Sequence, residues 1–322
     1  QGNSNDGTAQ SGAWPRVENY PLTDLLEYED FSRDFLKGTD PVGMTGCIDS
    51  EKVHFMSTFL GEKKVQLVVT YNEQRAREIE EDYKLFCSQV YVIPPRDLIF
   101  FSADLQGNAI IAERMKAFAA LYQNEAKVII TTMDALMSAA VPFEQLMSHV
   151  IKLKEGDELD LEKLKHDLTV MGYERVGRVE EPGQFTVHGG IADVYPLTME
   201  VPVRIELWGD EIDTIRCFEP QSQRSMDQIE CVSVFPAAEV IADDTARRRA
   251  VGMIQNELES QLAVFKKVKE PDKAKRLREE TNRILEALGE DVVLEAPDSY
   301  ISYFYPRTVQ LSEYFDEKNT LV

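Results

Sequence analysis

Two apolar runs set the strongest limit on how the first half of this chain can fold. The segments VQLVVTY (residues 65–71) and KVIITT (127–132) are nearly continuous in apolar residues, which is typical of strands buried on both faces. Segments with apolar residues at helical spacing, 72–86 and 107–122, lie between them. Strands that alternate with helices predict an α/β fold with a parallel, doubly wound sheet in residues 21–145.

The pattern changes near residue 145. A short predicted helix at 160–171 is followed by a mostly strand-like region at 172–236. Together they predict a smaller α+β domain over residues 146–236.

The clearest element of this second region is a hairpin. RIELW (204–208) alternates polar and apolar residues, and the pair Gly209-Asp210 suits a two-residue turn. In the returning strand, Ile212 and Ile215 break strict alternation and predict a β-bulge.

The alternation assigns side chains to the two faces of the strand. If Ile205 faces the core, then Arg204 and Trp208 face the other way. Two interpretations of that other face stay open. A helix covers it and makes Trp208 part of the core, which composition alone favours, or the face is bare and binds a partner, since Trp and Arg are enriched in interfaces.

The last third of the chain is predicted to be helical. Two charged helices, at 243–269 and 273–288, are separated at Pro271 and form a hairpin whose charged faces are solvated. A segment rich in Tyr and Phe, 300–315, follows.

Composition limits the function classes. The net charge of −22 opposes DNA binding by the chain as a whole and favours a protein-binding or regulatory module. The chain has no 18-residue apolar run and no signal peptide, which predicts a cytoplasmic protein without a membrane partner. Residues 1–20 are predicted to be a disordered leader or a remnant of an expression vector. The whole chain is expected to be an N-terminal piece of a longer protein.

Metal and disulfide chemistry have no sequence support. The histidines are scattered, and the cysteines lack the spacing of a metal site or a disulfide framework, so no metal site is predicted. The cysteines are Cys47, Cys87, Cys217 and Cys231.

An octet ahead of the first predicted strand has the length of a phosphate-binding loop but not its chemistry. A working loop reads GxxxxGK[ST], in which the second glycine admits the phosphate and the lysine neutralises it. Here Ile48 replaces that glycine and Asp49 replaces that lysine, so the loop is predicted to be inactive. Its residues of interest are Gly43, Thr45, Gly46, Ile48, Asp49 and Ser50. From the residues alone, an ordinary glycine-containing turn remains the simpler interpretation.

The segments GGIADVYP (189–196) and VRIELWGDEID (203–213) resemble the excision-repair protein UvrB, and more closely the UvrB-homology module of the transcription-repair coupling factor family (Mfd). The resemblance implies a split, RecA-like P-loop domain with a degenerate loop, an inserted small domain, and a part at 237–322 that combines the helical hairpin with a return to the first domain. It also implies that the small domain docks UvrA through Arg204, Trp208 and His188. The family often has Phe at the second of these positions and Arg at the third.

The resemblance further implies a non-catalytic module that recruits nucleotide excision repair to stalled RNA polymerase. In that family the docking surface is masked by a contact with the C-terminal part of the full-length translocase. RNA polymerase and DNA bind regions outside this chain, and the fragment needs no cofactor because ATP and magnesium act only in the motor. The alternative is a UvrB-like, ATP-dependent enzyme that binds damaged DNA.

Two features favour the coupling-factor interpretation. The segment 94–108, which contains Phe100 and Phe101, is too short for the tyrosine-rich DNA-clamping hairpin of UvrB. The degenerate loop would also disable UvrB, and the sequence reaches Val322 before any acidic magnesium-binding box.

Overall fold

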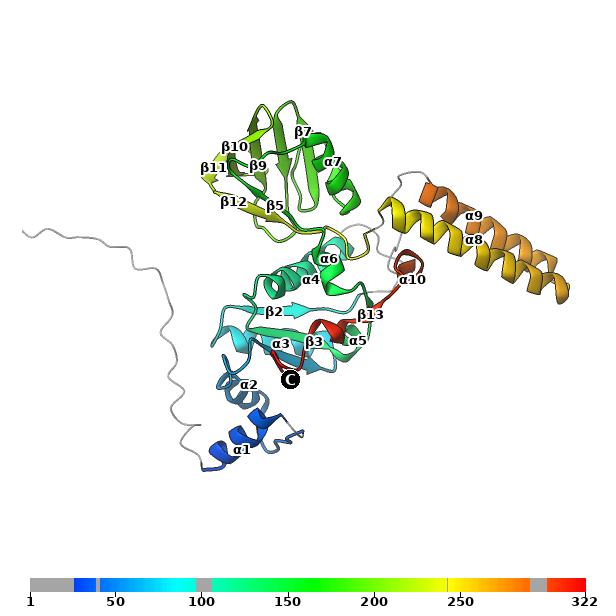
Figure 1. The fold of residues 1–322 in the computed structure, drawn as a ribbon. Coiled ribbons are helices and arrows are strands. Elements are labelled where there is room, and N and C mark those ends of the chain that lie inside the picture. The colour runs from blue at the N-terminus through cyan, green and yellow to red at the C-terminus, as the bar shows by residue number, and fades with distance from the viewer. Residues whose placement is uncertain (1–25, 39–40, 97–105, 242, 290–299) are drawn as a thin grey trace, which may run out of the picture.

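A computed structural model describes residues 26–38, 41–96, 106–241, 243–289 and 300–322 of the chain (Figure 1). It is a mixed α/β structure with a parallel sheet, a separate and mostly antiparallel sheet, and several helices. The predicted leader at 1–20 lies outside the described residues. So does most of the 94–108 segment, including Phe100 and Phe101.

The α/β body is built on a four-stranded sheet in the order β14-β1-β3-β2, with every neighbouring pair parallel. This confirms the predicted parallel sheet. The strands are β1 (Val65–Thr70), β2 (Val90–Ile93), β3 (Val128–Thr132) and β14 (Thr320–Leu321).

Helices cover both faces of this sheet, which explains why its strands have no polar side. On one face, α2 (Asp49–Ser57) and α3 (Glu73–Lys84) pack against Val128 and Ile130. On the other face, α4 (Gln106–Tyr122) packs against Ile129 through Met115 and Phe118. The predicted cap of α3 is present, since the Asn72 side chain accepts a hydrogen bond from the Arg75 amide. Helix α1 (Leu26–Lys37) packs its aromatic rings against α2.

The strand module, residues 151–234, holds a six-stranded sheet in the order β11-β10-β9-β8-β7-β6. Its inner face is covered by α7 (Leu161–Val170) and by the two-stranded sheet of β5 (Ile151–Lys154) and β12 (Cys231–Val234). The six strands are β6 (Glu174–Arg175), β7 (Gln184–His188), β8 (Ile191–Val194), β9 (Val203–Trp208), β10 (Glu211–Phe218) and β11 (Ser225–Gln228).

The predicted hairpin and bulge are confirmed. Trp208 pairs with Glu211 across the turn, where Gly209 has a φ of +66° that a glycine adopts without strain. The register between β9 and β10 shifts between Ile212 and Thr214. Because of this bulge, Ile212 and Ile215 both point into the core.

The C-terminal third returns to the α/β body. Helix α8 (Asp244–Lys267) and helix α9 (Pro271–Gly289) form the predicted hairpin, which projects away from the rest of the molecule (Figure 1). Pro271 is the first residue of α9, a position where its missing N–H costs nothing. Further along, β13 (Val309–Gln310) pairs with β4 (Ala139–Ala140), and β14 pairs with β1. The remaining short helices are α5 (Met133–Leu136), α6 (Phe143–Met147), α10 (Ile301–Phe304) and η2 (Leu311–Tyr314).

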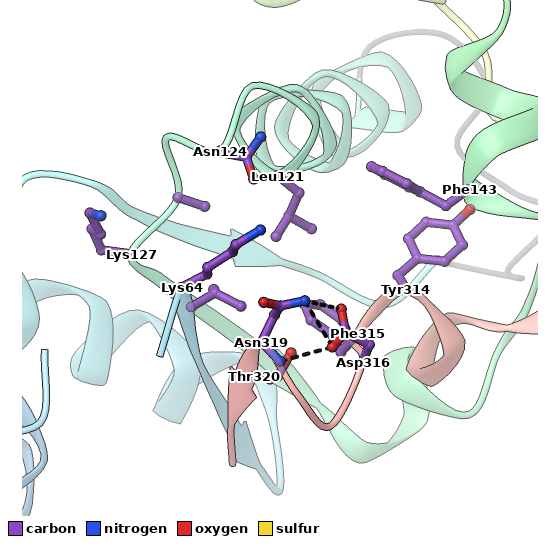
Figure 2. A pocket seen from close by; sticks show the side chains of 12 residues that line it. Lys64, Leu121, Asn124, Lys127, Phe143, Tyr314, Phe315, Asp316, Asn319 and Thr320 are labelled. Carbon is purple, nitrogen blue, oxygen red and sulfur yellow. Dashed lines mark hydrogen bonds between the residues drawn. The ribbon is translucent and has the colours of Figure 1, made fainter. Parts of the chain in front are cut away.

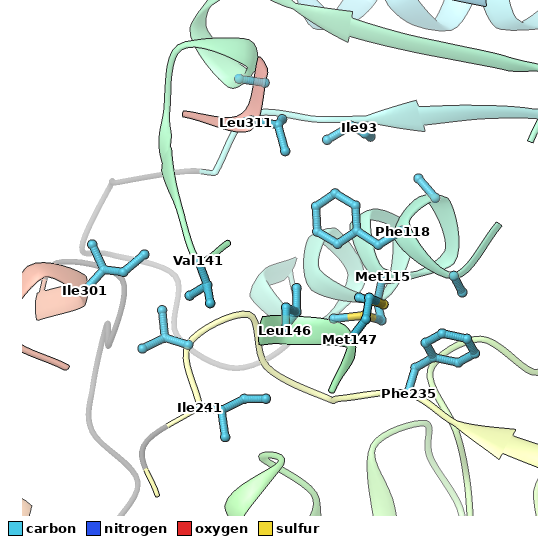
Figure 3. Packing of buried hydrophobic residues seen from close by; sticks show 14 of the residues in the cluster. Ile93, Met115, Phe118, Val141, Leu146, Met147, Phe235, Ile241, Ile301 and Leu311 are labelled. Atoms are coloured by element: carbon cyan, nitrogen blue, oxygen red, sulfur yellow. The ribbon is translucent and has the colours of Figure 1, made fainter. Parts of the chain in front are cut away.

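One core joins these distant parts of the sequence. Figure 3 shows Phe118 of α4 and Leu146 of α6 close to Phe235, Ile241 and residues of the C-terminal segment. The strand module is therefore fastened to the body through the chain segment that follows β12.

Candidate functional site

The outer face of the six-stranded sheet, the face turned away from α7 and the β5–β12 pair, carries two rows of side chains set by the strand register. One row runs across β7, β8, β9 and β10 through His188, Ile191, Glu206 and Thr214. The next row runs through Thr186, Asp193, Arg204 and Arg216. Trp208 lies on the same face, one pleat beyond Glu206.

Trp208 is bare. Its exposed fraction is 84%, the highest among the exposed large hydrophobic residues that the structure describes. The interpretation that places Trp208 in the core is therefore wrong, because α7 and β5–β12 cover the opposite face. Ile191 is also exposed, at 40%. His188 is exposed and is the direct cross-strand neighbour of Ile191.

Arg204 is held in a fixed orientation by its neighbours. Its Nε and Nη2 groups each donate a hydrogen bond of 2.7 Å to Asp193, and Nη2 also reaches Gln223 at 3.3 Å. The guanidinium lies 4.7 Å from the centre of the Phe218 ring. The bond to Asp193 outweighs burial and raises the pKa of Arg204, so the group stays charged. Within the described residues, its Nη1 group has no hydrogen-bond partner, and 22% of the side chain is exposed.

The residues that support Arg204 are not among those predicted from the sequence. Asp193 belongs to the GGIADVYP segment, pairs with Arg204 across the strands, and has a side chain that is only 9% exposed. Phe218 packs with Val179 and Tyr195 in a small cluster that closes one end of the outer face. The open end of that face consists of His188, Ile191, Glu206 and Trp208, and we call it the open patch.

Removing the indole of Trp208 is expected to leave the free chain almost unchanged. The side chain is exposed, so Trp208→Ala should alter the free energy of unfolding by no more than about 0.5 kcal/mol. Urea denaturation followed by circular dichroism measures this. A loss of several kcal/mol would mean that Trp208 is a packing residue after all.

The phosphate-loop octet has no regular secondary structure at residues 43–48, and its last two residues begin α2. Ile48 is 63% exposed and immediately precedes the helix. Asp49 accepts a hydrogen bond of 3.0 Å from Lys52 and lies 3.6 Å from Arg75. These cations lower the pKa of Asp49, so a negative charge occupies the position of the phosphate-binding lysine. Gly43, Thr45 and Gly46 precede the helix, and Ser50 is its second residue.

A cavity of about 510 Å³ opens at the end of the parallel sheet where its strands begin (Figure 2). It is lined where β1, β3 and β14 begin, by residues that include Lys64, Lys127, Phe143 and Asn319. Ligands of open α/β sheets bind at the carboxyl ends of the strands, so this cavity is not in the position of a nucleotide site.

No helix among the described residues is long and apolar enough to cross a membrane. In the same part of the chain, no group of three His, Cys, Asp or Glu side chains is placed to hold a metal ion.

Comparison with known proteins identifies the module that carries the open patch. Residues 151–239 match the family model described as the UvrB interaction domain. The transcription-repair-coupling factor of Bacillus subtilis is 29% identical over 282 residues, which is 87% of this chain and 24% of that protein.

Two staphylococcal proteins with the same description are also similar. The Staphylococcus haemolyticus factor is 33% identical over 70% of this chain, and a Staphylococcus epidermidis factor is 30% identical over 95% of it. The matches span 19% and 26% of those two proteins, so this chain corresponds to about a quarter or less of its relatives. Residues 151–239 thus belong to the UvrB interaction domain family, within a chain that is homologous over most of its length to the transcription-repair-coupling factors.

Proposed function

We propose that the outer face of the six-stranded sheet docks UvrA, and that the chain is a non-catalytic module which recruits nucleotide excision repair to stalled RNA polymerase. The observation that carries the proposal is the 84% exposed Trp208 on the same sheet face as an oriented arginine, inside a UvrB interaction domain. A tryptophan this exposed adds little to the stability of the free chain, whereas Trp is enriched among the residues that anchor interfaces.

The chemistry of the face fits a partner with an apolar pocket and an acidic group. Trp208 and Ile191 would fill the pocket, and the Nη1 group of Arg204 would donate to a carboxylate. Asp193 fixes the guanidinium in advance, which lowers the entropy lost on binding. His188 lies in the row beside the anchor and would contact the rim of the partner.

The remainder of the family assignment is part of the same proposal. The α/β body would be a degenerate RecA-like domain that is split in the sequence. Residues 21–145 would form its first part, residues 146–236 would form the inserted UvrA-binding domain, and residues 237–322 would contain the helical hairpin and the return to the body. In the longer cytoplasmic protein, a contact with the C-terminal part would mask the face. RNA polymerase, and the DNA on which the motor acts, would bind the translocase outside this chain.

The loop chemistry predicts that this chain does not bind ATP. Asp49 repels a triphosphate where a lysine would attract it, and exposed Ile48 replaces a glycine. Titration with a fluorescent ATP analogue and Mg²⁺ should therefore show no saturation up to millimolar concentrations. The variant Ile48→Gly/Asp49→Lys restores the sequence GxxxxGKS and is the matched comparison. Micromolar saturation by the unaltered chain would support the UvrB-like enzyme instead.

Titration of purified UvrA with the folded chain tests the docking role directly. Saturable binding supports the proposal. Absence of binding by the unaltered chain would remove the proposed function and leave the fold and the family in place.

A further inference from the structure

The tip of the α8–α9 hairpin carries a concentration of positive charge in a chain whose net charge is −22. Between residues 266 and 278 there are seven lysines and arginines and only two acidic residues, Glu270 and Asp272. The basic residues are Lys266, Lys267, Lys269, Lys273, Lys275, Arg276 and Arg278, and all are exposed. Of these seven, only Lys273 and Lys275 form ion pairs with described residues. Lys273 pairs with Glu270 at 2.8 Å, and Lys275 pairs with Glu279 at 3.9 Å.

Helix stability does not account for this charge. Lys266 and Lys267 lie in the last turn of α8, where cations favour the helix dipole. Lys273, in contrast, lies in the first turn of α9, where a cation is unfavourable, and Lys275 and Arg276 follow after Ala274. The sequence therefore keeps basic residues near the start of α9, where the helix dipole does not favour them.

The fold separates the basic tip from the acidic remainder of the chain. A helix of 24 residues, the length of α8, extends about 36 Å, and the hairpin projects away from the body (Figure 1). The screening length at about 0.1 M salt is roughly 10 Å, so the field of the body is weak at the tip. The repulsion of polyanions that the net charge implies does not extend to this element.

The arrangement of the charges indicates the kind of ligand. A groove of about 810 Å³ runs between the helices near the tip, with Leu262 and Phe265 among its lining residues. Lys266, Lys269, Lys275 and Arg278 line it, but Lys267, Lys273 and Arg276 do not. Because the basic residues surround the tip instead of framing the groove alone, they fit an extended polyanion better than a single peptide lying in the groove.

We propose that the tip of the α8–α9 hairpin binds the phosphate backbone of duplex DNA without sequence preference. The contacts are point charges from lysine and arginine, which suit phosphates and read no base sequence. The binding surface is separate from the open patch on the strand module, so the inference does not depend on the proposed UvrA contact.

Fluorescence anisotropy with a labelled duplex of about 20 base pairs tests the proposal, at about 50 mM NaCl and then at increasing salt. The unaltered chain should bind with a Kd of about 10⁻⁶–10⁻⁴ M, the range of non-specific binders. The tip variant Lys266→Gln/Lys267→Gln/Lys275→Gln/Arg276→Gln should bind at least about tenfold more weakly. The slope of log K against log salt should also become less steep by about 3.6, because four phosphate contacts are removed.

A control variant carries the same charge change elsewhere. Lys37→Gln/Lys84→Gln/Lys154→Gln/Lys318→Gln alters four exposed lysines outside the hairpin and should keep the affinity of the unaltered chain within about twofold. Circular dichroism verifies that the helices of both variants are intact.

Three outcomes would overturn the proposal. The first is the absence of duplex binding by the unaltered chain at low salt, and the second is equal weakening by the tip and control variants. The third is displacement of the duplex by poly-L-glutamate at equal charge concentration, which would identify the tip as a site for acidic polypeptides.

Discussion

The change Glu239→Ala is expected to destabilise the chain by about 3–5 kcal/mol, a large part of the stability of a typical protein. Glu239 lies in the segment after β12 that fastens the strand module to the body, and its side chain is 4% exposed. Removal of its carboxylate would leave Arg114, which is fully buried, without its counter-charge, and would remove one ion pair from Arg96.

The geometry around Glu239 supports this magnitude. Arg114 of α4 is 0% exposed and donates to both carboxylate oxygens, while Arg96 donates to Oε2 at 2.8 Å. Arg114 also donates to the carbonyl of Pro94 at 2.6 Å. The buried Arg114 thus depends on Glu239 for its counter-charge, and an uncompensated buried charge is among the costliest defects in a protein.

The pH dependence follows from the same contacts. Burial raises the pKa of Glu239, but the charges and hydrogen bonds of Arg114 and Arg96 outweigh it, and the pKa is lowered below the ordinary value of 4.5. A lowered folded-state pKa means that the stabilisation is complete above pH 4.5 and is lost as the pH falls. The stability difference between the unaltered chain and Glu239→Gln should therefore be constant at neutral pH and shrink on acidification.

Glu200→Ala is the matched control for Glu239→Ala. Glu200 also pairs with α4, through Lys116 at 2.7 Å, but its side chain is 86% exposed. Its removal should cost less than about 1 kcal/mol, the range of surface ion pairs. Urea denaturation of both variants measures the difference. Equal unfolding midpoints would contradict the role assigned to the buried carboxylate.

The largest effect on binding is expected from the pair Arg204→Glu/Trp208→Ala, which should weaken the UvrA complex at least about 100-fold. Truncation of a central tryptophan anchor typically costs about 2 kcal/mol or more, and reversal of the arginine adds repulsion from an acidic partner. Because Arg204→Glu also faces Asp193, the unfolding curve of this variant must be recorded beside its affinity. Dissociation rates by biolayer interferometry should account for most of the loss.

A control double substitution on the same sheet distinguishes the loss of this contact from a general effect of charge on binding. Arg224→Glu/Met226→Ala makes the same kinds of change at the edge strand β11 and just before it, where both residues are exposed. It should leave the UvrA affinity within about twofold of the unaltered chain. Equal losses in the two pairs would show that binding does not depend on the open patch.

Local patterns in the sequence predict the elements of this fold well. The apolar runs at 65–71 and 127–132 predict the parallel strands, and Gly209-Asp210 predicts the hairpin turn, because each signal lies within a few neighbouring residues. The alternation in RIELW also predicts correctly that Arg204 and Trp208 share a face. It does not show which face is covered, since that depends on how α7 and β5–β12 pack against the sheet.

Pairs that are distant in the sequence are harder to predict. Asp193 meets Arg204 only through the register of β8 and β9, and that register is a property of the folded sheet. Glu239 is 125 residues from Arg114, and a single glutamate in a connecting segment looks like a solvated residue. The role of Asp193 at the candidate site and the ion pair of Glu239 with Arg114 could therefore be found only in the structure. Arg204, Trp208 and His188, in contrast, were predicted through the resemblance.

We propose above that the exposed Trp208 and the oriented Arg204 of the six-stranded sheet dock UvrA. Isothermal titration calorimetry of purified UvrA with the unaltered chain, and with Arg204→Ala/Trp208→Ala, tests it most directly. We predict saturable binding that the double change abolishes while the chain stays folded. Binding of equal affinity by both chains would contradict the assigned surface, and no binding by the folded, unaltered chain would contradict the docking function itself.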